Sequence, residues 1–180
     1  MTVVRRMVWS TLVAMGIASV SAAGDVAVAG PLAPPTVARF HDIRTRLEAI
    51  GKEMGQTEGE DSIKASFASD TKFRDCFRET YDVVSGVDDQ SYWLENIVWL
   101  SSKMVDQRDQ GTVNHTLLTE LEISAGKVGF LAMQKNFLKE PKRFCPDNAY
   151  IVSHVSQVSS LIDELSAQIQ ITKTDIQGMH

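Results

Sequence analysis

The most regular pattern of apolar and polar positions lies near the C-terminus, between Pro146 and Gln177. Apolar or near-apolar side chains recur there at alternating steps of three and four residues, as in an amphipathic helix with a seven-residue repeat. The repeating positions are Val155, Val158, Ile162, Leu165, Ile169, Thr172 and Ile176. Cys145 directly precedes Pro146, and proline is tolerated in a first helical turn. The pattern predicts a long central helix on which the earlier helices pack.

A similar stripe predicts the first helix of the fold, from about Thr36 to Met54. Its apolar positions are Val37, Phe40, Ile43, Leu47, Ile50 and Met54. Gly55 is suited to cap the C-terminus of this helix. We expect residues 55–61, which are polar and acidic, to form a solvated loop.

Helix-disfavouring residues divide the middle of the chain. Ser69-Asp70-Thr71 is typical of a helix break, because these side chains compete for backbone hydrogen bonds. Gly86 and Gly111 are expected to end helices, and a helix should also stop before Pro141, since the residue preceding proline avoids the helical region. The helical regions predicted between these points are 62–85, 91–110 and 112–139.

Together these segments predict an all-α fold, an antiparallel bundle of four to five helices joined by short turns. No segment shows the sustained strict alternation of a half-buried strand. The apolar share of 43% and the charged share of 23% are ordinary for a soluble globular chain. A chain of 180 residues needs only one core, so we assign residues 36–180 to a single domain.

The N-terminus has the pattern of a cleaved signal peptide rather than of a bundle helix. Arg5 and Arg6 precede a short apolar run, and small residues follow it. We expect residues 1–23 to be removed, with cleavage after residue 29 as an alternative. An uncleaved membrane anchor is the competing interpretation. Residues 24–35, rich in proline and alanine, predict a flexible tether. The protein is therefore expected to be exported, to a periplasm or outside the cell.

Net charge restricts the kinds of partner. The chain carries a formal charge of −5, and removing residues 1–23 takes away Arg5 and Arg6 but no acid, which leaves −7. An acidic surface disfavours binding to nucleic acid. No second apolar run is long enough for a transmembrane segment, so the mature chain is expected to have none. A protein partner and homo-oligomer formation both stay open.

Cys76 and Cys145 are the two cysteines of the chain. In an exported protein such a pair most simply forms one disulfide. It would close a loop of about 70 residues and contribute about 4 kcal/mol in the chain-entropy model. Two buried free thiols or one reactive cysteine are the alternatives, but neither cysteine has a histidine nearby in sequence.

Candidate chemistry is sparse. The chain has no Glu-x-x-His, His-Glu-x-x-His, Cys-x-x-Cys-His, Gly-x-Ser-x-Gly or Gly-rich phosphate motif. We therefore assign no catalytic residue, no metal ligand and no cofactor. Two alternatives remain: a metal or small molecule held between helices near His41, His154 or the methionines, and a hydrolase of unrecognised type.

Aromatic residues of the 91–110 helix suggest a contact surface. Helical spacing places one face toward the core and puts Tyr92 and Trp99 opposite it. The predicted core face comprises Trp93, Leu94, Ile97, Leu100, Ser101 and Met104. Exposed aromatic side chains are typical hot spots of protein contacts. The alternative is that another helix of the same chain covers them.

The 112–139 helix adds further candidates. Phe130, Met133 and Phe137 face away from its main apolar stripe, and Gly126 and Gly129 would allow a neighbouring helix to approach closely. A basic segment with Lys139, Lys142 and Arg143 follows; these cations either receive an acidic partner or only stabilise the negative end of the helix. The partner-binding candidates are Tyr92, Trp99, Phe130, Met133, Phe137, Lys139, Lys142 and Arg143. The sequence thus favours a non-enzymatic exported bundle that binds another protein, as an adaptor, accessory factor or inhibitor.

Overall fold

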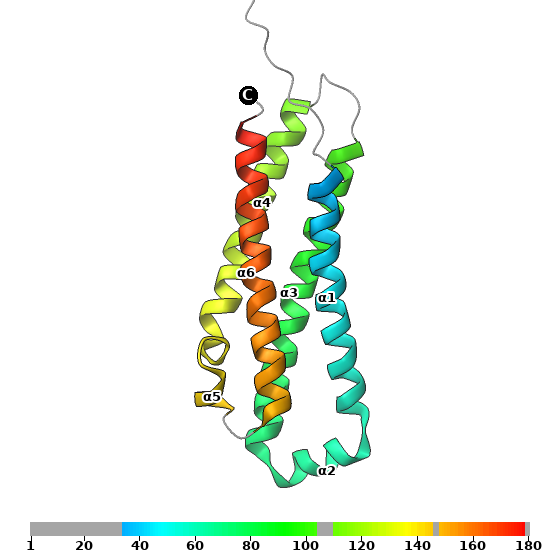
Figure 1. Ribbon diagram of the computed structural model, residues 1–180, viewed down its shortest axis with the longest axis vertical. Coiled ribbons are helices and arrows are strands. Elements are labelled where there is room, and N and C mark those ends of the chain that lie inside the picture. Colours follow the sequence, from blue (N-terminus) through cyan, green and yellow to red (C-terminus); the bar gives the residue numbers. More distant parts are fainter. Residues whose placement is uncertain (1–33, 104–109, 146–147, 179–180) are drawn as a thin grey trace, which may run out of the picture.

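A computed structural model describes residues 34–103, 110–145 and 148–178, and within them every regular element is a helix (Figure 1). The all-α prediction is therefore confirmed for this part of the chain. Four helices are long: α1 (Pro34–Gly59), α3 (Thr71–Lys103), α4 (Gln110–Gln134) and α6 (Ala149–Gln177). Three short elements complete the set: α2 (Asp61–Ser69), the 3-10 turn η1 (Asn136–Leu138) and α5 (Pro141–Phe144).

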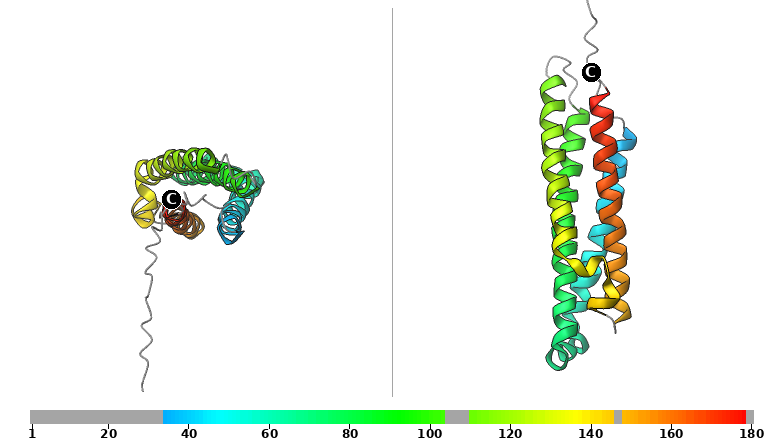
Figure 2. Two further views of the ribbon diagram at one scale, coloured as in Figure 1. Left: turned by 90° about the horizontal axis from the view of Figure 1, so that it is seen from above. Right: turned by 90° about the vertical axis from the view of Figure 1, so that its left-hand side faces the viewer.

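Successive long helices run in opposite directions. In Figure 1, α1 and α4 descend, whereas α3 and α6 ascend. α1 packs against α3 and α6, and α4 completes the ring by packing against α3 and α6 (Figure 2). This is the up-down-up-down arrangement of a four-helix bundle. α2, η1 and α5 lie at the lower end of Figure 1, which we call the lower end of the bundle.

The core follows the predicted stripes. All seven repeating positions of α6, from Val155 to Ile176, are buried. Phe40, Ile43, Leu47 and Met54 of α1 are completely buried. Burying each large aliphatic or aromatic side chain contributes roughly 1.5–3 kcal/mol, so these stripes supply much of the force that joins α1 and α6 to the bundle.

The helix ends predicted at Gly55 and Gly86 are both wrong. α1 continues past Gly55 to Gly59, and α3 passes through Gly86 without a break. A Cβ atom at Gly86 would lie 3.3 Å from two methyl carbons of Leu131, so the glycine lets α4 approach α3 closely. Gly55 lies similarly against the Tyr81 hydroxyl, at 3.3 Å. Glycine serves helix packing at these positions rather than helix termination.

The predicted break at residues 69–71 is confirmed. α2 ends at Ser69, and Asp70 has an extended backbone. The Asp70 carboxylate accepts a hydrogen bond from the N–H of Phe73 at 2.9 Å, which caps the start of α3. A polar side chain that can bond backbone N–H groups therefore separates the two helices.

The chain between α4 and α6 is less helical than predicted. α4 ends at Gln134, five residues before the expected end, and η1 turns Phe137 and Leu138 into the core. α6 begins at Ala149, where the side chain of Asn148 accepts a hydrogen bond from the N–H of Ile151 at 3.1 Å. The predicted start of this helix at residue 146 lies outside the described residues.

The two cysteines are paired as predicted. The sulfur atoms of Cys76 and Cys145 lie 2.05 Å apart, and the Cα atoms 6.1 Å apart. The disulfide joins the second turn of α3 to the residue that follows α5. It therefore fixes the lower end of α3 beside the start of α6.

At the N-terminus, Pro34 and Pro35 belong to α1 rather than to the expected tether. Proline suits a first helical turn, because it needs no hydrogen-bond acceptor there. The expected signal peptide and the rest of the tether lie outside the described residues. Among the helices that are described, none combines the length and the apolar character that crossing a membrane requires.

Candidate functional site

Large exposed hydrophobic side chains gather on two neighbouring helices, α3 and α4. In the described part of the chain, seven of the nine such side chains belong to these helices. They are Tyr92, Trp93, Trp99, Leu100, Ile123, Phe130 and Met133. The predicted candidates Tyr92, Trp99, Phe130 and Met133 are thus at the surface, with Met133 63% exposed.

Five of these side chains form what we call the α3–α4 face. Trp93 and Leu100 are seven residues apart on α3, and Trp93 Nε1 donates a hydrogen bond to Glu120 of α4 at 3.1 Å. Ile123 follows Glu120 by one turn, and Phe130 lies two turns further along the same helix. The α3–α4 face comprises Trp93, Leu100, Ile123, Phe130 and Met133.

The buried face of α3 differs from the predicted one by a rotation about the helix axis, because the prediction included residues that lie on the α4 side. Leu94 and Ser101 are buried as expected, but Trp93 and Leu100 are exposed, and Val98 takes their place in the core. Ser91 also faces inward, and its hydroxyl donates to the backbone carbonyl of Asp88 at 2.8 Å. A serine that bonds its own helix can be buried at low cost. Met104 lies outside the described residues.

Tyr92 and Trp99 lie on the other side of α3, facing α1. The Arg44 guanidinium carbon is 4.7 Å from the centre of the Tyr92 ring, a cation–π contact. Trp99 lines a groove of about 460 Å³ between α1 and α3. The other residues of this groove are Val37, Ala38, His41, Glu95, Ser102 and Lys103. The two aromatic candidates therefore belong to a different surface from Phe130 and Met133.

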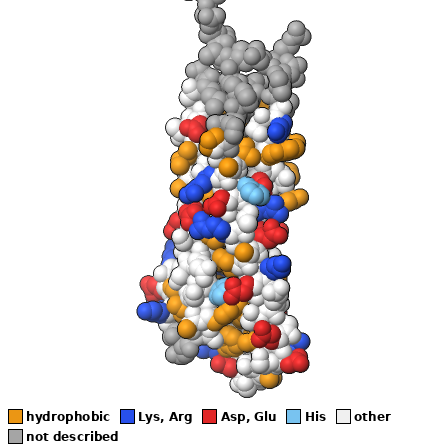
Figure 3. Space-filling view, turned by 45° about the vertical axis from the view of Figure 1, so that its right-hand side comes forward, with side chains coloured by type: hydrophobic (Ala, Val, Ile, Leu, Met, Phe, Trp, Pro, Cys, Tyr) orange, Lys and Arg blue, Asp and Glu red, His pale blue; other side chains and the backbone are white. Residues whose placement is uncertain are grey.

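A charged network holds α1 against α3 beside this groove. Glu95 accepts hydrogen bonds from His41 Nδ1 at 2.7 Å and from Arg44 Nη1 at 3.0 Å. Burial raises the pKa of Glu95, but the hydrogen bonds from His41 and Arg44 outweigh it, and the pKa is lowered overall. Figure 3, which brings the α1 side forward, shows acidic and basic side chains intermixed at mid-height. These charges compensate one another, which favours a structural role.

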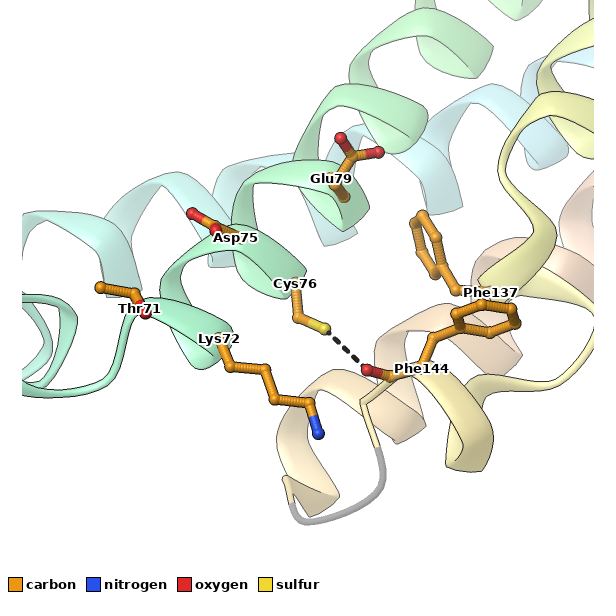
Figure 4. A pocket seen from close by; sticks show the side chains of 7 residues that line it. All are labelled: Thr71, Lys72, Asp75, Cys76, Glu79, Phe137 and Phe144. Carbon is orange, nitrogen blue, oxygen red and sulfur yellow. Dashed lines mark hydrogen bonds between the residues drawn. The ribbon is translucent and has the colours of Figure 1, made fainter.

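A second pocket lies at the lower end, beside the disulfide (Figure 4). Its volume is about 410 Å³, and Phe137 and Phe144 form its apolar wall. The Cys76 sulfur lies 3.3 Å from the carbonyl oxygen of Phe144 (Figure 4). Phe137 is only 8% exposed, so it lines this pocket from the core side and is no longer a surface candidate.

The basic segment is partly neutralised. Lys135 pairs with Glu79 at 2.7 Å, and Arg143 pairs with Glu140 at 3.3 Å. Lys139 and Lys142 are exposed. Because acidic side chains neutralise part of the basic segment, this end of the bundle should attract an acidic partner less strongly than the sequence alone predicts.

The structure does not bring His41 and His154 together. His154 is buried in α6, with its Nδ1 2.8 Å from the carbonyl oxygen of Tyr150 and its Nε2 3.3 Å from Glu53. Glu53 is twelve residues beyond His41 on α1, or roughly 18 Å along the helix. The described residues also contain no cluster of three or more His, Cys, Asp or Glu side chains that could hold a metal ion.

Sequence reasoning missed Trp93, Leu100 and Ile123 as surface residues. A usable signal was present, because Trp93 and Leu100, like Ile123 and Phe130, are seven residues apart and so share a helix face.

Comparison with protein-family models, with curated proteins and with solved structures found no match for this chain.

Proposed function

We propose that this chain is an exported, non-enzymatic helical protein that binds another protein through the α3–α4 face. The observation that carries the proposal is that five large hydrophobic side chains, each 45–63% exposed, gather on the neighbouring helices α3 and α4. Exposed apolar side chains that gather on one part of a protein surface are typical of interaction sites. Aromatic side chains such as Trp93 and Phe130 are also frequent hot spots.

The chemistry of the two surfaces fits protein binding. The charged groups near Trp99 are paired with one another and join α1 to α3. The five side chains of the α3–α4 face are aliphatic, aromatic or thioether groups, and none of them carries a hydroxyl group. Such a face offers area and shape to a protein partner, but few groups for acid–base chemistry.

A photo-crosslinking amino acid at Leu100 tests the proposal in the source cells. Leu100 is 55% exposed on the α3–α4 face, whereas Ile171, 53% exposed on α6, provides a matched control. We expect a discrete adduct with another protein from the Leu100 position, reduced by Trp93→Ala, and none from the Ile171 position. Equal adducts from both positions, or none from Leu100, would contradict the proposal.

Export is a separate part of the proposal and has a separate test. It rests on the basic, apolar and small-residue order of residues 1–23. The intact mass of the protein recovered from the exported fraction should correspond to a chain that begins at Gly24 or, for the alternative cleavage site, at Gly30. A full-length mass beginning at Met1 would argue against a cleaved signal peptide.

The groove beside Trp99 supports a second candidate function, the binding of a small molecule. Its volume of about 460 Å³ falls in the range of ligand sites, and it combines apolar walls with His41 and Lys103. Native mass spectrometry of the exported protein should then show a mass excess that Trp99→Ala removes. An unliganded mass in the wild-type protein would count against this candidate.

A further inference from the structure

A second seven-residue seam runs along the outward side of α4. Exposed residues follow one another there at steps of three and four over about five helical turns, roughly 26 Å. The positions are Thr116, Thr119, Ile123, Gly126, Phe130 and Met133, and we call them the α4 seam. A repeat of this kind is the pattern of a helix that packs lengthwise against another helix.

No helix of the described chain covers this seam. Leu117, Leu121 and Val128 turn the opposite side of α4 toward the core. A Cβ atom added to Gly126 would meet nothing within 4 Å. By contrast, the glycines at positions 51, 55 and 86 each have a neighbouring side chain at 3.3–3.4 Å from the added Cβ. Glycine is disfavoured inside helices, and the described residues give no packing reason for Gly126 or for the neighbouring Gly129.

The order of side-chain sizes along the seam is complementary to the same seam running in the opposite direction. Small residues occupy its N-terminal half, at Thr116 and Thr119, and large ones its C-terminal half, at Phe130 and Met133. Turning a second α4 helix antiparallel therefore places large side chains opposite small ones. In one register, Met133 faces Thr116 of the second copy, Phe130 faces Thr119, and Ile123 faces Gly126. A parallel arrangement would instead set Phe130 against Phe130.

Charge along α4 favours the same antiparallel arrangement. Glu120 and Glu122 lie in the N-terminal half, and Lys127 lies beyond the midpoint. In the register given above, Lys127 and Glu120 of the second copy lie on the same side of the seam, and their levels along the helix differ by less than one turn. The seam itself has no charged residue, so two acidic chains can meet along it without bringing like charges together.

We propose that this protein forms a homodimer in which two α4 helices pair antiparallel along the α4 seam. The inference rests on the proposed function, because three seam residues belong to the α3–α4 face, and it names a second copy as the partner on α4. Trp93 and Leu100 on α3 stay beside the dimer contact. Pairing along one seam on each copy gives a closed, two-fold arrangement rather than a filament.

Sedimentation velocity over a range of concentrations tests for the dimer. The mature, disulfide-bonded chain should change from monomer to dimer as its concentration rises. Phe130→Glu should abolish the dimer with little change in Tm, because Phe130 is 53% exposed. Ile171→Glu, at the same exposure on α6, should still form the dimer. A monomer at every concentration, or equal loss in both variants, would overturn the proposal.

Cysteine crosslinking tests the register. Thr119→Cys and Phe130→Cys chains, mixed and oxidised, should form a mixed dimer, and neither should crosslink efficiently alone. Efficient crosslinking of Phe130→Cys with itself would indicate a parallel pair and overturn the antiparallel arrangement. A strictly monomeric protein that still forms the Leu100 adduct described above would refute the dimer and leave the proposed function intact. A dimer that forms no Leu100 adduct would support pairing along the α4 seam and contradict binding of another protein through the α3–α4 face.

Discussion

At the scale of single residues, two carboxylates of α3 lie near the same arginine and have opposite pKa shifts. Burial raises the pKa of Asp88, and the nearby Arg44 only partly offsets it. One of the Asp88 carboxylate oxygens is buried without a hydrogen-bond partner in the described structure. Glu95 is also shielded, but two hydrogen bonds lower its pKa overall. The two residues should therefore affect stability in opposite directions as pH changes.

Glu95→Gln is expected to lower the free energy of unfolding at neutral pH by about 1–2 kcal/mol, because it weakens charge-assisted hydrogen bonds from His41 and Arg44. A carboxyl group whose pKa is lowered by folding stabilises above its unfolded pKa, near 4.5, and this contribution is lost as pH falls through the lower folded value. Urea unfolding at pH 7 and pH 3 measures the effect. A difference from the wild-type protein that persists unchanged at pH 3 would contradict it.

Asp88→Asn is expected to raise Tm slightly at neutral pH, since it removes a charge that burial penalises. The raised pKa means that the folded protein binds the proton more tightly than the unfolded chain, so the contribution of Asp88 to stability falls as pH rises from about 3.8 through its higher folded pKa. The gain from the substitution should consequently vanish in acid. Thermal unfolding across pH 3–7 tests this, and a lower Tm at pH 7 would show that the attraction to Arg44 dominates.

Residue identities predicted part of the candidate surface and missed the rest for a physical reason. Tyr92, Trp99, Phe130 and Met133 are exposed because each lies far from the apolar stripe of its helix. Trp93 was assigned to the core because helical spacing places it on one face with Leu94 and Ile97. The serine faces inward because it satisfies its hydroxyl within α3. Tertiary packing therefore decided the rotation of this helix.

At the scale of helices, apolar periodicity located the long elements better than it located their ends. The stripes of α1 and α6 are buried as predicted. Gly55 and Gly86 were mistaken for helix ends, since a glycine that terminates a helix and one that admits a neighbouring helix look the same in sequence. Asp70 gave a reliable break, because its carboxylate bonds the backbone of the helix that follows.

Gly86→Leu is expected to lower the free energy of unfolding by about 1–3 kcal/mol, the usual cost of overpacking. The added side chain would collide with Leu131 where α4 crosses α3. Gly129→Leu is the control, because a Cβ there meets nothing within 4 Å and leucine favours helix. Urea unfolding of both variants measures the difference. Equal stability of the two variants would show that α3 and α4 can separate at no cost.

At the scale of the whole molecule, the all-α class and the antiparallel order were predicted from the sequence. The predicted short turns are wrong at two connections, because α2 joins α1 to α3, and η1 and α5 lie between α4 and α6. The ring order of α1, α3, α4 and α6 did not follow. It depends on which faces meet, and these faces are set by long-range contacts such as the Glu95 bonds between α1 and α3. The α3–α4 face could not be predicted for the same reason, because the rotation of α3 about its axis decides whether Trp93 and Leu100 are exposed.

The disulfide should make a large contribution to global stability. Replacing both Cys76 and Cys145 by serine opens a loop with a sequence separation of 69 residues, which is expected to cost about 4 kcal/mol in the chain-entropy model. Urea unfolding of the double variant against the oxidised wild-type protein measures this cost. A reduced wild-type sample should resemble the variant, and a negligible difference between oxidised and reduced protein would show that the crosslink adds little.

The position of the crosslink also determines how the bundle would carry a mechanical load. The start of α1 and the end of α6 lie at the same end of the molecule in Figure 1, and the disulfide lies at the other. A pulling force on these two ends would peel α1 and α6 away from that end, and would then pass through the sulfur–sulfur bond. The segment between the cysteines, which are separated by 69 positions in the sequence, contains most of α3 and all of α4. It would carry no load, and roughly 240 Å of chain would extend only after reduction.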